Sequence, residues 1–517
     1  MRGDGVRLLY TFGEQSKFSY QAGQGPCLVR DTLKHRRRAP LFMYLSQRFL
    51  KGLGCLSYLV GDEETGEAAV IDPQLDVEHY LREAEEAGLR IRHVLDTHLH
   101  ADHVSGNRAL AAATGATLHL PARAKAAFPC EPLREGTEVR LGNVVLRARE
   151  TPGHTPEHVT FEVVDRTRPT DRPYALLTGD TLLVGSVGRP DLVATTGAGD
   201  LGGMLFESFR KLLPETPDGT LVYPGHGPGS ACGANLGRLL STTLGYEKET
   251  NPYLQEAGRD AFVRRVVTGL PPRPGNAVTI KRINTQGPPL RVPSPTEVQA
   301  FAPEALSAEV GDGRSVLVVD TSEPDAWAAN HVPGSVNVPY DAVQFANRIG
   351  YFLEEDQPVY LVMPEDDPLG EVLLAMARVG GVDVRGYLGG GVAAWRNAGM
   401  PFETVPVVSA QTVARELQEG ATRVLDVRTR REWEEGHIEG ATWAPWEQLT
   451  KDVEGLDPDE PWTVVCASGY RSSMAASLLK RAGFPEVANL LGGMTAWEAS
   501  GGATVPERGG VAPAKPA

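Results

Sequence analysis

The sequence is poor in cysteine, in positive charge and in long apolar runs, and each shortage argues against a class of protein. Five cysteines (27, 55, 130, 232 and 466) among 517 residues are too sparse, and odd in number, for a disulfide framework. We therefore expect a reducing, cytoplasmic compartment. No apolar run approaches the roughly 20 residues that span a bilayer, so no membrane partner is expected. The net charge of −15 argues against a nucleic-acid partner, because phosphate binding needs concentrated positive charge.

The chain length predicts three or four domains. Residues 1–42 carry the basic cluster Lys34–Arg38 and little hydrophobic periodicity, and they lack the apolar core of a signal peptide. We expect them to form a disordered extension, with Met43 opening the first domain. The last residues, 506–517, are rich in proline, glycine and alanine and predict a flexible tail.

From Met43 onwards, short apolar runs alternate with turn residues and helical patterns. This alternation predicts an α/β layer structure whose strands lead into functional loops. The proline-rich stretch Leu270–Pro274 reads as a linker, so the first domain is expected over residues 43–270. The expected strands are Ser57–Val60, Ala68–Ile71, Val94–Asp96, Val144–Ala148, His158–Val163, Ala175–Leu177 and Thr220–Tyr223.

The second half of the chain contains an internal repeat. Residues 320–339 and 426–445 share Asp, Trp, His, Gly and Pro at a constant offset, since Asp320 and Asp426, like His331 and His437, are 106 positions apart. The repeat predicts two α/β domains of similar size, over residues 276–404 and 405–505.

A group of histidines and aspartates indicates a metal site in the first domain. Residues 97–103 read T-H-L-H-A-D-H directly after the strand Ile91–Asp96, and alternate residues of an extended chain point to the same side. Three further candidates stand in loops flanked by glycine or threonine, as expected of ligands held on tight turns. Imidazole and carboxylate donors suit zinc, iron or manganese. The seven candidates are His98, His100, Asp102, His103, His154, Asp180 and His226.

This set resembles the metallo-β-lactamase superfamily over roughly residues 43–260, which implies an αββα sandwich. Two classes within it fit the residues. Glyoxalase II-like hydrolases use all seven positions to hold two zinc ions and a hydroxide that attacks a thioester. ETHE1-like persulfide dioxygenases bind one Fe(II) per chain, here through His98, His154 and Asp180, which leaves positions for a thiol persulfide and O₂. In that case an outer shell consists of His100, Asp102, His103 and His226.

Local sequence favours the dioxygenase. The segments A-D-H-V-S-G (101–106) and S-V-G-R-P-D (186–191) resemble that class, and Gly106–Asn107 departs from the Gly-Gly pair of the hydrolases. Arg189 is a candidate for gripping an anionic part of the substrate, the alternative being a structural pair with Asp191. Cys232 is a candidate for handling sulfur near the metal, the alternative being a buried small hydrophobe.

A second motif, W-T-V-V-C-A-S-G-Y-R-S-S over Trp462–Ser473, predicts a nucleophilic cysteine. An apolar strand runs into Cys466 and then towards a helix, so backbone N–H groups and the helix dipole favour the thiolate, with Arg471 opposite the sulfur. The same loop would hold a persulfide or an oxyanion through Ser468, Gly469 and Tyr470.

This loop resembles the rhodanese active site, in which Cys466 would take up a sulfane sulfur and pass it on. In the first repeat Met363 stands opposite Cys466 and is followed by P-E-D-D-P, so this copy is expected to be catalytically silent. Together the resemblances imply an α/β multidomain chain in which a metallo-β-lactamase domain precedes a silent and an active rhodanese-like domain. The order of the three domains also resembles that of bacterial persulfide dioxygenase–sulfurtransferase fusions.

The resulting hypothesis is Fe(II)-dependent oxidation of a low-molecular-weight thiol persulfide by O₂ to sulfite, coupled to sulfur transfer through Cys466 that makes or uses thiosulfate. There are two alternatives. In the first, the metal domain is a dinuclear zinc thioester hydrolase and the rhodanese modules are accessory to it. In the second, the rhodanese modules only recruit a sulfur-carrier partner. Homo-oligomers are common in the resembling family, which leaves a homo-oligomer open for this chain. Glutathione, coenzyme A, bacillithiol and cysteine persulfides all remain candidate substrates.

Overall fold

The computed structural model describes residues 43–506, apart from 193–196, 231, 234–235, 271–272, 312–314, 355–356, 365–366, 382, 451–452 and 454. The expected extension 1–42, with Cys27, and all but the first residue of the expected tail lie outside the described residues. Among the described residues, no helix combines the length and the apolar character needed to cross a bilayer.

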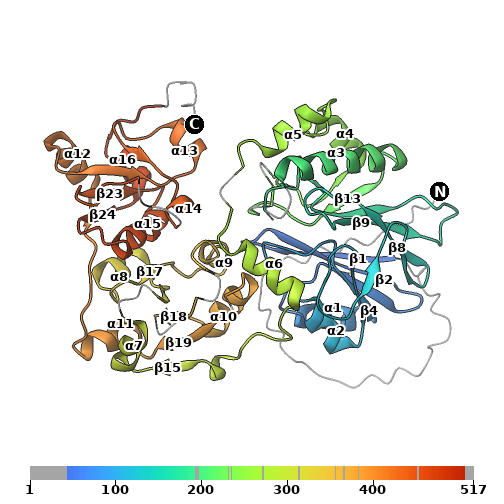
Figure 1. Cartoon of the computed structure of the whole chain (residues 1–517), viewed down its shortest axis with the longest axis horizontal. Coiled ribbons are helices and arrows are strands. Elements are labelled where there is room, and N and C mark those ends of the chain that lie inside the picture. Colours follow the sequence, from blue (N-terminus) through green and yellow to red (C-terminus); the bar gives the residue numbers. More distant parts are fainter. Residues whose placement is uncertain are drawn as a thin grey trace, which may run out of the picture.

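The first part of the chain is a sandwich of two six-stranded sheets (Figure 1). One sheet has the order β1 (Met43–Leu50), β2 (Cys55–Asp62), β3 (Glu67–Ile71), β4 (Arg90–Leu95), β5 (Thr117–Pro121) and β6 (Glu131–Leu133). The other has the order β14 (Thr242–Thr243), β13 (Leu221–Pro224), β10 (Ala175–Gly179), β9 (Val159–Asp165), β8 (Val144–Glu150) and β7 (Glu138–Leu141). A two-stranded ribbon, β11 (Leu182–Leu183) and β12 (Ser186–Val187), follows β10.

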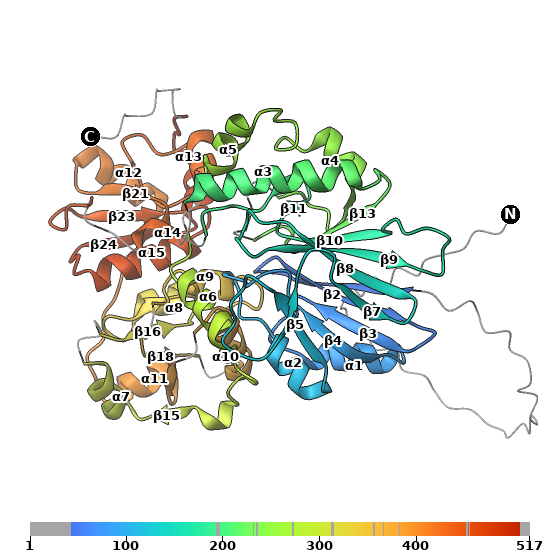
Figure 2. The ribbon, with the colours of Figure 1, turned by 45° about the vertical axis from the view of Figure 1, so that its right-hand side comes forward.

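Helices cover the outer faces of both sheets, which confirms the expected αββα sandwich (Figure 2). Strand β2 shows why the layers form: Leu56, Tyr58 and Val60 pack between the sheets, whereas Leu59 packs under the helices of the first sheet. A strand that is covered on both faces is apolar along its whole length. All seven expected strands are confirmed. The helices are α1 (Glu78–Glu86) and α2 (Asn107–Thr114) on one side, and α3 (Ala198–Glu215), α4 (Leu244–Thr250) and α5 (Arg259–Val267) on the other.

The internal repeat is confirmed as two five-stranded parallel sheets with the same strand order. The first has the order β15 (Gln299–Phe301), β19 (Val384–Leu388), β18 (Val359–Val362), β16 (Leu317–Asp320) and β17 (Val336–Asn337). The second has the order β20 (Val407–Val408), β24 (Val487–Leu490), β23 (Trp462–Val465), β21 (Arg423–Asp426) and β22 (Thr442–Trp443).

The repeated Trp and His residues stack on each other in both copies, with ring centroids 3.9 Å apart for Trp327 and His331 and 3.5 Å apart for Trp433 and His437. This shared stacking explains why the Trp and His residues recur in both copies.

The helices of the first copy are α7 (Pro303–Val310), α8 (Pro324–Ala329), α9 (Phe345–Ile349), α10 (Leu369–Arg378) and α11 (Gly391–Asn397). Those of the second are α12 (Ala410–Glu419), α13 (Arg430–Glu435), α14 (Trp446–Leu449), α15 (Tyr470–Arg481) and α16 (Gly493–Ala499).

Helix α6 (Ala277–Gln286), which precedes a short 3₁₀ turn at Pro295–Glu297, lies between the sandwich and the first repeated domain (Figure 2). Its Ile280 belongs to a buried cluster that contains Val104 of the sandwich and Phe345 of the repeated domain. The amide of Val104 donates to the carbonyl of Arg378 at 2.7 Å, and the Arg378 guanidinium pairs with Asp76 at 2.8 Å. The first repeated domain is therefore packed directly against the loop that carries the histidine motif.

Candidate metal centre and sulfur-transfer site

Three of the predicted ligands, His98, His154 and Asp180, meet at the edge of the sandwich where strands end. His98 follows β4, His154 lies between β8 and β9, and Asp180 follows β10, and one donor atom of each lies within 4.8 Å of the others. The His154 Nε2 and Asp180 Oδ2 atoms are 3.3 Å apart. All three side chains are buried.

Hydrogen bonds aim these donors at a common point. Thr97 Oγ1 lies 2.9 Å from Asp72 Oδ2 and donates to it, so the neighbouring His98 Nδ1 donates to Thr97 and Nε2 keeps its lone pair. His154 Nδ1 donates to the carbonyl of Arg189 at 2.8 Å, which leaves Nε2 free in the same way. Among the described residues, His98 Nε2 and Asp180 Oδ2 have no hydrogen-bond partner although both are buried. Buried polar atoms without partners fit a site built for a cation.

Glycines flank the ligands because other side chains would fill the site. Gly179 has a φ of +46°, and a Cβ there would lie 2.5 Å from His158 Nε2 and 2.7 Å from Thr97 Oγ1. A Cβ at Gly225 would lie 2.7 Å from Asp180 Oδ1. The glycines in T-G-D and P-G-H therefore allow the loops to approach closely.

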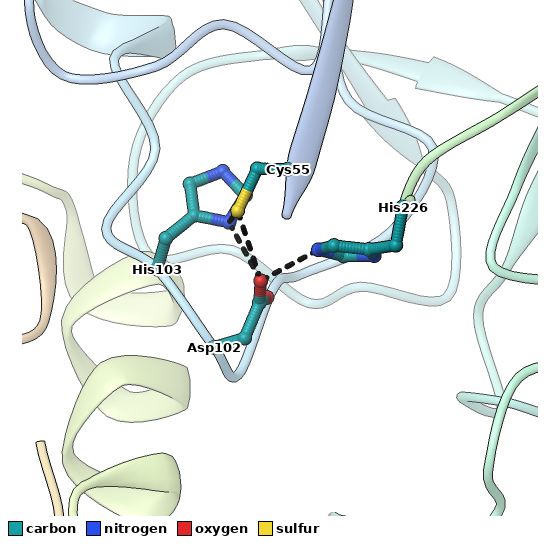
Figure 3. A group of neighbouring side chains, drawn as sticks. All are labelled: Cys55, Asp102, His103 and His226. Atoms are coloured by element: carbon teal, nitrogen blue, oxygen red, sulfur yellow. Dashed lines mark hydrogen bonds and ion pairs between the residues drawn. The ribbon is translucent and has the colours of Figure 1, made fainter. Parts of the chain in front are cut away.

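A second set of donors lies beside the first, around Asp102 (Figure 3). Asp102 Oδ2 lies 2.7 Å from His226 Nε2 and 3.2 Å from His103 Nδ1. His226 also reaches the first set, since its Nδ1 lies 2.6 Å from Asp180 Oδ1. Burial alone would lower the pKa of His226, but the carboxylates of Asp180 and Asp102 hold it well above its usual value. Burial opposes ionisation of Asp180, yet His226 and His154 hold its pKa down at about 2.

His100 does not join either set through its Nε2 atom, which lies 3.2 Å from Asp72 Oδ1. Its Nδ1 atom is 3.8 Å from Asp102 Oδ1. The structure thus gathers six of the seven candidates around two neighbouring points and turns His100 towards Asp72.

Several residues of the site escaped the sequence argument. Cys55, at the start of β2, lies 3.3 Å from Asp102 through its Sγ atom. His158 accepts from the amide of Asp180 at 3.0 Å, and burial lowers its pKa to about 3, so it is neutral. Asn284 of α6 donates to the carbonyls of His100 and His103, at 3.0 and 2.8 Å. Among these residues, only His158 could have been found from the sequence, because it stands four positions after His154. The other contacts join segments that are far apart in the chain.

The two predicted substrate residues of the first domain have structural partners. Arg189 is buried, and its guanidinium forks onto Asp191 at 2.6 and 2.7 Å, as in the alternative interpretation. Its carbonyl orients His154. Cys232 is buried, and its Sγ atom lies within 4.8 Å of a donor atom of Asp180 and of His226. Burial raises the pKa of its thiol well above the usual value. Substrate binding by either residue stays a prediction.

Cys466 stands where β23 turns into α15, as the motif predicts. The amide of Gly469 donates to Cys466 Sγ at 3.1 Å, and the Ser472 hydroxyl lies 3.4 Å from it. Ser468 is exposed, and the exposed Tyr470 donates its hydroxyl to Glu323 of the first repeated domain at 2.5 Å. Gly469 has a φ of +109°, which lets the loop curl its amide towards the sulfur.

Arg471 forks onto Glu432, with nitrogen–oxygen distances of 2.8 and 2.6 Å. Burial opposes the ionisation of Glu432, but hydrogen bonds from Arg471 and Thr429 hold its pKa at about 2. The hydrogen bonds to Glu432 raise the pKa of Arg471 further above its usual value. The pair holds the guanidinium charge beside the cysteine loop.

The first repeated domain has Met363 at the position of Cys466. A Cβ at Gly391 would lie 2.6 Å from the Met363 carbonyl oxygen, and a Cβ at Gly493 would lie 2.3 Å from that of Cys466. The two backbones therefore match at Met363 and Cys466, and only the second copy places a thiol there.

Comparisons with known proteins agree with both parts of the structure. The family model described as metallo-beta-lactamase superfamily matches residues 50–226, and the model of the rhodanese-like domain matches residues 302–398 and 409–500. A crystal structure of a metallo-beta-lactamase from Staphylococcus aureus is 31% identical with a TM-score of 0.59, covering 67% of this chain and 98% of that one.

Two curated relatives represent the two classes in contention. Hydroxyacylglutathione hydrolase of Polaromonas sp. is 40% identical over 173 residues, 33% of this chain and 61% of that protein. The mitochondrial persulfide dioxygenase ETHE1 of Mus musculus is 31% identical over 201 residues, 38% of this chain and 70% of that protein. This chain therefore spans about three fifths of the first relative and just over two thirds of the second. Similarity alone does not separate the two classes.

Proposed function

Because the chain belongs to the metallo-β-lactamase superfamily and carries two C-terminal rhodanese-like domains, we propose that it is a persulfide dioxygenase with sulfurtransferase activity. In this proposal the first domain, residues 43–270, oxidises a low-molecular-weight thiol persulfide with O₂ to sulfite. The silent domain, residues 276–404, is a docking element, and residues 405–505 transfer sulfur through Cys466. The setting is the detoxification of sulfide in the cytoplasm.

The observation that carries the proposal is the position of Asp180 between the two donor sets. Its Oδ1 is occupied by His226 Nδ1 at 2.6 Å, and only Oδ2 faces His154. A dinuclear hydrolase needs this carboxylate to be shared by two ions around a bridging hydroxide. If His226 keeps this hydrogen bond when the metal binds, Oδ2 alone is left for an ion, which favours the mononuclear dioxygenase.

His98, His154 and Asp180 would hold Fe(II). A bound ferrous ion with two histidines and one carboxylate would supply open positions for the persulfide and O₂. The chain's own residues fix the site: Thr97 orients His98, the Arg189 carbonyl orients His154, and His226 orients Asp180. Such partners of a metal ligand hold its tautomer and its direction.

The Cys466 loop would carry the sulfane sulfur. The Cys466 thiolate attacks the outer sulfur of thiosulfate, the S–S bond breaks, and sulfite leaves with the electron pair. A thiol substrate, as its thiolate, then takes the outer sulfur and releases the Cys466 thiolate. In the opposite direction, sulfite takes the sulfur from the Cys466 persulfide and gives thiosulfate. The Gly469 amide and the nearby Arg471 charge favour the anionic sulfur in both directions.

A dinuclear zinc thioester hydrolase is the second candidate. It is favoured by the seven ligand-type residues and by the 40% identity to hydroxyacylglutathione hydrolase of Polaromonas sp.. In that case the rhodanese-like domains would be accessory to the hydrolase.

Oxygen uptake by the anaerobically purified, Fe(II)-loaded full chain supplied with glutathione persulfide tests the proposal. We expect rapid uptake, one iron per chain, and a shift from thiosulfate to sulfite when Cys466 is replaced in Cys466→Ser. If the rhodanese-like domains only dock a partner, the ratio of thiosulfate to sulfite will be the same in the wild type and in Cys466→Ser. Absence of uptake with glutathione, coenzyme A, bacillithiol and cysteine persulfides, together with thioester hydrolysis by protein holding two zinc ions, would overturn the dioxygenase.

A further inference from the structure

We propose that helix α6, through Lys281 and Asn284, holds the loop His98–His103 in the shape that binds a metal ion, and that the first rhodanese-like domain controls this hold. The helix lies between that domain and the sandwich and packs against both (Figure 2). The inference rests on the metal centre of the proposed function, but it does not depend on which reaction the centre performs. It gives the domain without a thiol a task at the metal site.

An ion pair between α6 and the sandwich holds the peptide groups on both sides of Leu99, the residue that follows His98. Lys281 Nζ donates to the Leu99 carbonyl at 3.0 Å, and the Leu99 amide donates to Glu157 Oε1 at 3.3 Å. The same Glu157 oxygen pairs with the Lys281 ammonium, and only 17% of the Lys281 side chain and 6% of the Glu157 side chain are exposed. Because Glu157 follows His154 by three positions, the pair joins the loops that carry these two histidines.

Asn284, three positions further along α6, holds the rest of the loop. Residues at this spacing lie next to each other on a helix, so Asn284 and Lys281 can act on one stretch of chain. The Asn284 side chain donates to the carbonyls of His100 and His103 at 3.0 and 2.8 Å. Its oxygen accepts from the Ser105 amide at 3.0 Å. Buried peptide groups need such partners, so the path of the loop depends on where α6 lies.

The beginning of α6 is anchored to the first rhodanese-like domain. The side chain of Asn276, directly before the helix, donates to the Val379 carbonyl at 2.7 Å, and its backbone amide donates to the Gly350 carbonyl at 3.4 Å. A Cβ at Gly350 would lie 2.8 Å from Asn276 Nδ2, so the domain fits closely around this side chain. Ile280 is fully buried in the cluster that the two domains share. Asn276 and Ile280 thus bind α6 to the domain, and neither is a candidate metal ligand.

The same segment of the domain also contacts the end of the loop. The Val104 amide donates to the Arg378 carbonyl at 2.7 Å, and Arg378 immediately precedes Val379, the acceptor of Asn276. An ion binds less tightly when the conformation that aligns its ligands is less populated. Loosening the contact between α6 and the domain should therefore lower metal affinity, although no ligand is changed.

Cobalt(II) affinity of the metal-free full chain, measured without O₂ by competition with a chelator, tests this control. The part of the cobalt spectrum that is lost in His98→Ala reports on the first donor set. We expect Asn276→Ala and Ile280→Ala to weaken cobalt binding there by about fivefold or more, as is usual for coupled sites. We also expect the amides of Leu99 and Val104 to exchange hydrogen faster in both variants. If one variant does not fold, the other serves as the test.

Each variant has a matched control of the same residue type. Asn251→Ala removes another buried amide of the metal domain, one that bonds to Ser186 and Glu247. Ile438→Ala truncates a buried isoleucine in the core of the second rhodanese-like domain. Both controls should lower the unfolding midpoint and leave cobalt affinity and loop exchange unchanged, because neither residue contacts α6 or the loop in the hydrogen bonds and clusters of the structure.

Unchanged cobalt affinity in either folded variant, or an equal loss in its matched control, would overturn the proposal. So would the absence of cobalt binding that depends on His98 in the wild type. The measurement uses neither persulfide nor O₂. Weakened cobalt binding in the two variants, together with absence of oxygen uptake by the wild type, would therefore reject the dioxygenase and retain the control by the first rhodanese-like domain.

Discussion

The Ser473 hydroxyl, in the helix that follows the Cys466 loop, donates to the Asn337 side-chain oxygen of the first rhodanese-like domain at 2.5 Å. Both side chains are buried, and the amide of Asn337 donates in turn to Ser477 Oγ at 3.0 Å. At the other end of α15, Arg481 donates to the carbonyls of Gly334 and Val316. The domain without a thiol thus holds the helix that follows the Cys466 loop of its neighbour.

Removing the Ser473 hydroxyl should loosen this contact. In Ser473→Ala the buried Asn337 oxygen loses its donor, which costs about 1–3 kcal/mol. We expect a lower unfolding midpoint and slower sulfur transfer from thiosulfate, with unchanged oxygen uptake at the metal site. Ser500→Ala, whose exposed hydroxyl donates to the Trp497 carbonyl, is the control. Equal effects of the two variants would contradict a docking role for Ser473.

Asp320 should make the first rhodanese-like domain sensitive to pH. Its counterpart Asp426 pairs with Arg428, but Ser322 replaces the arginine beside Asp320. Burial raises the pKa of Asp320 to about 6 from a usual 3.8. Because the folded state then binds the proton more tightly than the unfolded state, stability rises as the pH falls from 8 to 5. The ionised form is destabilised by about 3 kcal/mol above the folded pKa.

Asp320→Asn removes this ionisation. We expect it to raise the unfolding midpoint by several degrees at pH 8 and to change it little at pH 5, measured by scanning calorimetry. The matched variant Asp426→Asn weakens a buried ion pair and should lower the midpoint at both pH values. A gain in Asp320→Asn that is the same at pH 5 and pH 8 would show that ionisation is not its cause.

Asn284 should control metal retention from outside the ligand set. Asn284→Ala leaves the carbonyls of His100 and His103 and the amide of Ser105 without their partner. These bonds hold the backbone of the loop that carries His98, so we expect iron to be lost more readily to a competing chelator. Asn251→Ala, which removes a buried amide that bonds to Ser186 and Glu247, should lower stability without this loss.

Arg471→Lys should separate the two activities. Lysine cannot fork onto both oxygens of Glu432, and a hydrogen bond to a charged group is worth about 1.5–3 kcal/mol. We expect kcat/KM for sulfur transfer to fall by a factor of about 10 to 150, with oxygen uptake unchanged. Arg431→Lys, whose exposed guanidinium pairs with Glu435 in α13, is the control and should change sulfur transfer much less.

The pH dependence of the Arg471 pair follows from Glu432. With a pKa of about 2, its carboxylate contributes stability above its usual pKa and loses it only as the pH falls towards 2. Between pH 5 and 8 the wild-type pair should therefore impose no change on sulfur transfer. A pH–rate profile in which Glu432→Gln abolishes a transition inside that window would contradict this assignment.

Local sequence predicted the fold and most of the candidate ligand set. Apolar runs of strand length predicted the strands, and turns rich in glycine marked the positions of His154, Asp180 and His226. The repeat offset of 106 predicted two similar α/β domains, because equal spacing of Trp327 and His331 and of Trp433 and His437 reproduces one packing unit. These features can be predicted from the sequence because each depends on residues close together in the chain.

The tertiary structure decided how those residues are used. It placed Cys55 against Asp102, 47 positions away, Asn284 against the His100 carbonyl, 184 positions away, and Ser473 against Asn337, 136 positions away. It also turned the His226 ring so that one nitrogen faces Asp180 and the other faces Asp102. A sequence pattern gives the residue types, but the direction of a ring nitrogen depends on the packing of distant segments around it. That packing determines whether the Asp180 carboxylate serves one metal ion or two.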